Sequence, residues 1–132
     1  MTPRLSTEQM SALKGQLQEQ FDGLREAVRL ELLSSDNERY LELAGRVHDP
    51  GDESVADLLV DVGLALIHRH VEAIRETEAA LLRMVRGTYG VCASCGSDIG
   101  YERLASEPAA TRCYDCQQVH ERAFVQPGRA TL

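Results

Sequence analysis

The four cysteines of this chain fall into two close pairs, and their spacing constrains the fold more than any other feature. Cys92 and Cys95 form one C-x₂-C pair, and Cys113 and Cys116 form a second pair after a gap of 17 residues. Each pair directs two sulfurs at one point, and this arrangement is typical of a tetrahedral zinc site with four thiolates. Two disulfides or four free thiols are the alternatives. We expect structural Zn²⁺, because four protein ligands leave no coordination position open.

Upstream of the cysteines, apolar residues recur at steps of three and four, which predicts long helices. Ser6 and Gln9 have the spacing of a capping box, with Leu5 and Met10 at the positions of a hydrophobic staple. A second apolar series runs from Val55 to Val85, and Gly87 follows it. The first series comprises Met10, Leu13, Leu17, Phe21, Leu24, Val28 and Leu32.

The segment from His48 to Glu53 is the first clear interruption of this pattern. Asp49 suits the N-cap of a second helix, with Pro50 at its first position and Asp52 at the third. Two long helices joined by a short turn pack as an antiparallel pair. We therefore expect residues 5–86 to form a coiled-coil hairpin with its tip at residues 48–54. The alternative is a compact three- or four-helix bundle, with residues 34–37 as another turn.

The remaining chain predicts a small finger built around the metal. We expect residues 87–125 to hold the four-cysteine site and a short C-terminal helix, and residues 126–132 to form a flexible tail. The fold class is thus mainly α: a long antiparallel coiled-coil hairpin attached to a four-cysteine zinc finger. The core of the finger is predicted to contain Tyr89, Val91, Ile99 and Leu104.

Charge and composition narrow the function classes. The net charge is −7, and the stretch from Glu31 to Asp61 alone carries nine acids against two bases. This balance argues against binding to nucleic-acid phosphates. The sequence has no Gly-rich phosphate loop and no serine–histidine–aspartate set, so we expect no enzyme. No apolar stretch resembles a signal peptide or a membrane span, so we expect a cytoplasmic protein. We also expect it to be a monomer.

Residues around the cysteines add a family resemblance. The region resembles the DksA/TraR family zinc finger, and the upstream helices resemble the longer, DksA-type members. In those members a coiled coil carries an Asp-x-x-Asp-x-Ala motif at its tip, a place taken here by Asp49, Asp52 and Ser54. The matching finger positions are Tyr89, Gly90, Cys92, Cys95, Gly96, Ile99, Arg103, Leu104, Pro108, Ala110, Cys113, Cys116 and Gln117.

The resemblance implies a regulator of transcription that binds RNA polymerase and has no sequence-specific DNA binding. It implies that the hairpin enters the secondary channel of the polymerase and brings the tip acids near the catalytic centre, which alters initiation. Arg69 is a candidate polymerase contact on the second helix. A zinc-stabilised coiled-coil adaptor for another protein partner is the alternative function.

Two departures from the family pattern modify these expectations. Ser54 replaces the alanine of the tip motif and adds a hydroxyl there. Many family members act with the alarmone ppGpp, and those members offer basic side chains around the finger and the hairpin base. Glu76, Glu107 and Gln117 occupy this region here. Acids and a neutral amide are poor partners for a polyphosphate, so we expect weak or absent ppGpp coupling.

Overall fold

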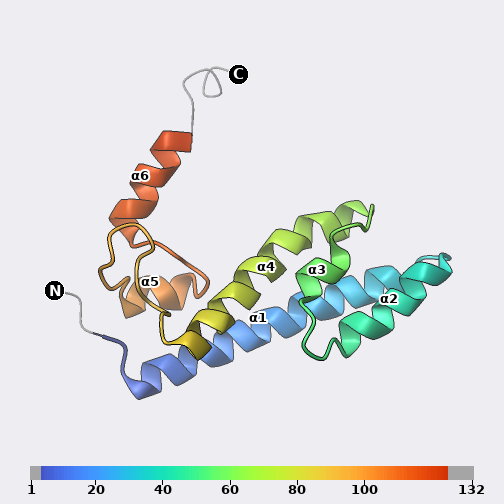
Figure 1. Ribbon diagram of the computed structural model, residues 1–132, viewed down its shortest axis with the longest axis horizontal. Helices are drawn as coiled ribbons and strands as arrows, with labels where there is room; N and C mark the ends of the chain where they lie inside the picture. Colours follow the sequence, from blue (N-terminus) through green and yellow to red (C-terminus); the bar gives the residue numbers. More distant parts are fainter. Residues whose placement is uncertain (1–3, 125–132) are drawn as a thin grey trace.

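The computed structural model describes residues 4–124 and contains six helices, arranged as an elongated rod with a small finger at one end (Figure 1). Along the rod, α1 (Thr7–Leu33) and α4 (Ala65–Arg86) run antiparallel. The shorter α2 (Glu38–His48) and α3 (Val55–Leu59) pack on the half of the rod away from the finger. The finger contains α5 (Tyr101–Ser106) and α6 (Tyr114–Phe124). The predicted fold class, a mainly α antiparallel hairpin joined to a four-cysteine finger, is confirmed.

Helix α1 begins at the predicted capping box. The Ser6 hydroxyl accepts from the backbone N–H of Gln9 at 3.0 Å, and the Gln9 side chain accepts from the backbone N–H of Ser6 at 3.0 Å. Two N–H groups that lack partners within the helix are thereby satisfied. The predicted apolar stripe of α1 faces the interior of the rod. Its members Leu13, Leu17, Val28 and Leu32 are fully buried there.

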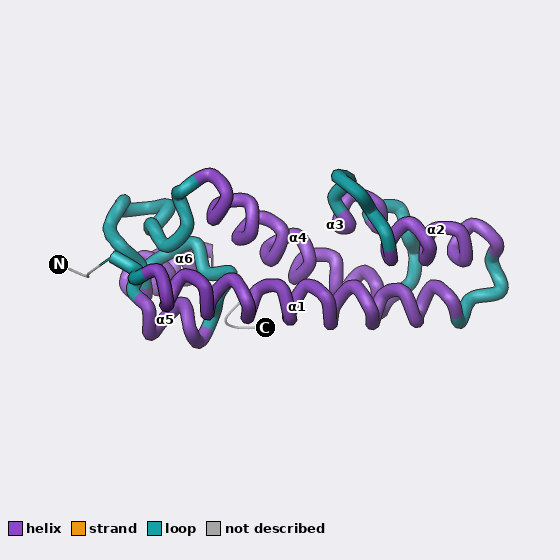
Figure 2. The backbone as a smooth tube through the Cα atoms, turned by 90° about the horizontal axis from the view of Figure 1, so that it is seen from below, coloured by secondary structure: helices purple, strands orange, loops and turns teal. Residues whose placement is uncertain are grey.

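The end of the rod far from the finger is the turn at residues 34–37. The Asn37 side chain accepts from the backbone N–H of Arg39 at 2.9 Å and caps α2, which folds back along α1 (Figure 2). Serine, aspartate and asparagine side chains compete for backbone hydrogen bonds, and this favours a turn over a continued helix. The four-residue turn predicted as an alternative is therefore present in this half of the molecule.

The expectation that residues 48–54 form the tip of the hairpin does not hold. Arg25 Nη1 of α1 donates to the carbonyl of His48 at 3.3 Å, and Glu78 of α4 accepts from Ser54. Arg25 lies eight residues before Leu33, or about 12 Å of helix. The segment thus lies beside the rod and short of its end. Apolar burial explains the difference, because folding α2 back buries Val47 completely.

The second arm is also interrupted where one continuous helix was expected. Asp49 ends α2, with its N–H donating to the carbonyl of Gly45 at 3.1 Å, and does not cap a following helix. Helix α3 begins only after Ser54, and residues 60–64 separate it from α4. The valines and the glycine in that connection are weak helix formers. Because the chain is not helical there, the side chain of Val62 can point into the core, where it is buried.

Two apolar cores hold the rod and the finger. The first core joins α1, α2, α3 and α4, and its fully buried members include Val28, Leu32, Val47, Val55, Ile67 and Ile74. The second core joins the near ends of α1 and α4 to the finger, through Leu13, Leu17, Ala80, Tyr89, Ile99 and Leu104. Each core is contributed by several elements, so neither long helix buries its apolar stripe alone.

Helix α4 ends where the sequence predicts. Gly87 adopts a left-handed φ of 77°, and the N–H of Thr88 donates to the carbonyl of Arg83 at 2.9 Å, which closes the helix end. Helix α6 extends from the finger away from the rod (Figure 1). The expected tail at residues 126–132 lies outside the described residues. Among residues 4–124 no helix combines the length and the apolar character needed to cross a membrane.

Candidate metal centre and acidic segment

The first cysteine pair is held by a tight backbone turn. The N–H of Gly96 donates to the carbonyl of Cys92 at 3.0 Å, and the N–H of Cys95 points at the Cys92 sulfur at 3.5 Å. Gly96 has a φ of 76°, a left-handed conformation that glycine adopts without steric cost. An antiparallel bridge between Val91 and Asp98 closes the turn.

The second pair lies at the start of α6. The N–H of Gln117 donates to the carbonyl of Cys113 at 2.9 Å, so helical geometry directs Cys113 and Cys116 to the same side. The N–H of Ala93 donates to the carbonyl of Thr111 at 2.8 Å and joins this part of the finger to the first turn. The two turns, far apart in sequence, are thereby brought together.

The four sulfurs form a cluster that fits Zn²⁺. All four Sγ atoms lie within 4.8 Å of one another, and those of Cys95 and Cys113 are 3.9 Å apart. Tetrahedral zinc with bonds of about 2.3 Å places its sulfur ligands about 3.8 Å apart. The structure has all four cysteines free, with no disulfide between them. The sulfurs of Cys92, Cys95, Cys113 and Cys116 are therefore placed to hold a structural Zn²⁺.

The thiol pKa values show why such a cluster favours a cation. Burial raises the pKa of Cys92, but hydrogen bonds from the backbone of Cys95, Cys113 and Ser94 outweigh it and lower the value to about 6. The thiol of Cys116 shares hydrogen bonds with the neighbouring sulfurs, first that of Cys113, and its pKa rises to about 12. Four thiolates at this separation repel one another, and a dication at their centre stabilises all four in ionised form.

The apolar core of the finger differs at one position from the prediction. Tyr89, Ile99 and Leu104 are buried as expected, whereas Val91 is 43% exposed. Val91 lies in the bridge to Asp98, where successive side chains point to opposite faces, and its neighbour Cys92 takes the inward position. The Tyr89 hydroxyl donates to the carbonyl of Pro108 at 2.7 Å, which ties the start of the finger to its return segment.

The acidic segment, residues 49–53, is fixed to both arms of the rod. On one side Arg25 of α1 donates to the carbonyl of His48, the residue that precedes the segment. On the other side the Glu78 carboxylate of α4 accepts from the Ser54 hydroxyl at 2.9 Å and from the backbone N–H groups of Val55 and Ala56 at 2.8 and 3.2 Å. The side chains of Asp49 and Asp52 between these anchors are exposed.

Ser54 and Glu78 have a role that the sequence analysis missed. Ser54 is the N-cap of α3, and its hydroxyl accepts from the N–H of Asp57 at 3.2 Å while it donates to Glu78. The spacing of Ser54 and Asp57 is a helix-start signal that could have been read. Glu78 gave no such signal, because only the fold brings it to the start of α3. Arg69 is exposed on α4.

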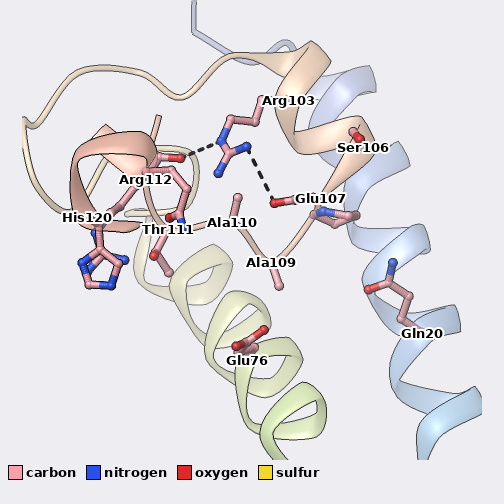
Figure 3. A pocket seen from close by; sticks show the side chains of 12 residues that line it. Gln20, Glu76, Arg103, Ser106, Glu107, Ala109, Ala110, Thr111, Arg112 and His120 are labelled. Atoms are coloured by element: carbon pink, nitrogen blue, oxygen red, sulfur yellow. Dashed lines mark hydrogen bonds and ion pairs between the residues drawn. The ribbon is translucent and has the colours of Figure 1, made fainter. Parts of the chain in front are cut away.

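A cleft of about 710 Å³ lies between the finger and the rod (Figure 3). Glu76 reaches it from α4 and Gln20 from α1, and the return segment of the finger forms the opposite wall. Arg103 is held by the carbonyl of Arg112 at 2.8 Å and by the carboxylate of Glu107 at 3.7 Å. The predicted neighbours Glu76, Glu107 and Gln117 thus line one cleft.

Known proteins share both parts of this architecture. Residues 87–122 match the family model of the prokaryotic DksA/TraR C4-type zinc finger. The RNA polymerase-binding transcription factor DksA of Caulobacter vibrioides is 31% identical over 90 residues, which cover 68% of this chain and 58% of that protein. The Escherichia coli DksA is 31% identical over 78 residues, covering 59% of this chain and 52% of that protein.

The similarity extends to a solved structure. The transcription factor DksA2 of Pseudomonas aeruginosa aligns with a TM-score of 0.60 at 24% identity, over 92% of this chain and 89% of that chain. At this identity the alignment supports the fold of the rod and finger together. By sequence, the matched region spans about half the length of the curated relatives.

Proposed function

Because the chain belongs to the DksA/TraR zinc-finger family as a DksA-like member, we propose that it binds bacterial RNA polymerase and regulates transcription. The observation that carries the proposal is the combination of the matched four-thiolate finger with an antiparallel α1/α4 rod. The curated relatives are RNA polymerase-binding transcription factors. The finger serves as a rigid base, since a zinc site with four protein ligands has no open position for chemistry. We propose a regulator and not an enzyme.

The shape of the rod supports insertion into a pore. Helix α1 alone has 27 residues and is about 40 Å long. The finger occupies one end and the narrow 34–37 turn the other (Figure 1). We propose that the rod enters the secondary channel of the polymerase with this turn leading and the finger remaining at the rim. Arg69, exposed on α4, is our candidate contact with the channel wall.

The acidic segment supplies the proposed effect on initiation. Asp49 and Asp52 are exposed, and Glu53 is paired with Arg46 at 2.8 Å. Carboxylates in a pore whose walls hold basic groups and Mg²⁺ change the local field strongly, because screening by water is weak there. We propose that Asp49 and Asp52 act on the polymerase from the side of the rod. Their action requires no contact with specific DNA bases.

The cleft between finger and rod supports a further part of the proposal, weak or absent coupling to ppGpp. Glu76 and Glu107 contribute two carboxylates to its lining, and its two arginines are already engaged: Arg103 by Glu107 and a backbone carbonyl, and Arg112 by the Ser94 hydroxyl. A polyphosphate in this cleft would face like charges. The protein is therefore proposed to act on polymerase without this nucleotide.

Crosslinking to purified bacterial RNA polymerase tests the proposed insertion. A photo-crosslinking residue placed at Asp36, in the far turn, is expected to react with polymerase segments near the catalytic centre. The same probe at Lys14, an exposed α1 position near the finger, is expected to react only with the outer rim. If the protein binds polymerase but neither probe crosslinks to segments of the secondary channel, the proposed insertion is contradicted. Absence of binding would instead favour the adaptor alternative with another protein partner.

A further inference from the structure

We propose that Glu78 is a positioning residue that fixes the acidic segment against the rod and thereby sets its effect on polymerase. The inference rests on the proposed function for its consequence, but the contact itself stands on the geometry. Glu78 Oε1 accepts from the Ser54 hydroxyl at 2.9 Å and from the N–H of Ala56 at 3.2 Å. Its Oε2 accepts from the N–H of Val55 at 2.8 Å.

These three bonds replace partners that α3 cannot supply for itself. The first N–H groups of any helix lack acceptors within the helix, and α3 has only five residues. The Ser54 hydroxyl accepts from the N–H of Asp57. The Glu78 carboxylate accepts from the N–H groups of Val55 and Ala56, so the free N–H groups in the first turn of α3 all have acceptors. Hydrogen bonds to a charged acceptor are among the stronger ones in proteins. The carboxylate therefore holds the start of α3 against α4.

This contact also fixes the acids nearby. Ser54 is two residues after Asp52, so the chain allows Asp52 a reach of only about 7 Å from the fixed point. The other end of the segment is held by Arg25 through the carbonyl of His48. The segment is thus anchored by one residue from each arm of the rod. Without Glu78 the start of α3 keeps its apolar packing and the ion pair between Asp57 and Arg75 of α4 at 3.6 Å, but it loses three hydrogen bonds, so the nearby acids gain freedom to move.

The same geometry explains the hydroxyl at position 54. An alanine there would leave Glu78 with only the two backbone donors and would leave the N–H of Asp57 without its cap. Ser54 instead bridges α3 and α4 through a single oxygen. We infer that the serine strengthens this particular docking.

The test compares Glu78→Gln with Glu72→Gln. Glutamine has the shape of glutamate, but one oxygen becomes an NH₂ donor that faces another donor. Glu72 is exposed on the same helix and serves as the matched control. In Glu78→Gln we expect hydrogen exchange at the amides of Val55 and Ala56 to accelerate by about tenfold or more, the effect of losing about 1.4 kcal/mol of protection. Exchange in α1 should stay unchanged, and Ser54→Ala should give a smaller acceleration.

The consequence for function is tested by measuring two quantities separately: the affinity for polymerase and the change in transcript output at saturating protein. Glu78→Gln should keep polymerase affinity within about twofold of the wild type, while the change in transcript output at saturating protein falls by more than half. General destabilisation would lower affinity as well, and that result would overturn the positioning role. Unchanged exchange at Val55 and Ala56, or faster exchange with full effect on transcription, would also overturn it. If the wild type binds no polymerase, the proposed function fails, whereas the exchange result still decides whether Glu78 holds the segment.

Discussion

The hydroxyl of Tyr89 donates a 2.7 Å hydrogen bond to the carbonyl of Pro108 inside the finger. Tyr89 is 6% exposed, so water cannot replace the bond. Tyr89→Phe should lower the free energy of unfolding of the zinc-loaded protein by about 1–3 kcal/mol, because a buried carbonyl is left without a donor. Chemical denaturation followed by circular dichroism measures the loss. Tyr114→Phe is the control, since that phenol is 62% exposed, and an equal loss in both variants would contradict the account.

The phenol of Tyr89 should also titrate late. Burial raises its pKa to about 12, above the ordinary value of about 10. The pKa of Tyr89 is higher in the folded protein than in the unfolded chain. Its contribution to the free energy of unfolding is therefore fully present below pH 10 and is lost as the pH rises toward 12. Tyrosinate absorbance in the folded protein should show one of the four phenols ionising near pH 12, and Tyr89→Phe should remove that step. Four phenols that all ionise near pH 10 would refute the prediction.

Zinc removal should unfold the finger and leave the far half of the rod folded. Metal binding to four thiolates contributes on the order of 10 kcal/mol to small zinc domains. The core around Ile67, Ile74 and Val28 includes no cysteine, so it should survive chelation. Hydrogen exchange after chelator treatment should accelerate in α5 and α6 and remain slow in the buried part of α4. Restoration by added Zn²⁺ is the control, and unchanged helicity and thermal unfolding without metal would disprove the prediction.

The cleft between the finger and the rod should prevent ppGpp from enhancing the effect of this protein. Titration of ppGpp into a transcription reaction should change the protein's effect by less than about twofold, because Glu76 repels phosphate and the two arginines of the cleft, Arg103 and Arg112, already have partners. A Glu76→Lys/Gln117→Lys variant should gain a measurable response, since it replaces an acid and an amide with cations. Glu72→Lys makes the same charge change as Glu76→Lys at an exposed α4 site outside the cleft lining. Strong ppGpp enhancement of the wild type would contradict this account.

The metal centre and the start of the rod could be predicted because their signals are local. Each C-x₂-C pair indicates a metal site through residues that are close in sequence. Ser6 and Gln9 form their capping box within one helical turn. The helical spacing of the apolar residues from Leu13 to Leu32 predicts which face of α1 is buried. Each of these features depends on residues close in sequence.

The fold-back of α2 was harder to predict because its apolar pattern fits two packings. Leu43 and Val47 have helical spacing whether α2 continues α1 or turns back on it, and only tertiary packing decides. Asp49 and Pro50 gave a strong local cap signal that competed with the weaker one at Ser54. The fold favoured Ser54, because Glu78, which lies 24 residues later, supplies acceptors for the same helix start.

The measurement that tests the central claim most directly is multi-round transcription in vitro with bacterial RNA polymerase at a promoter with a short-lived open complex. The wild type would be compared with Asp49→Asn/Asp52→Asn, alongside polymerase binding and a Glu8→Gln control, an exposed acid in the first turn of α1. We predict that the wild type and the control change transcript output, and that the double variant binds equally well but loses most of the effect. A double variant with full effect, or a wild type that does not bind polymerase, would contradict the account.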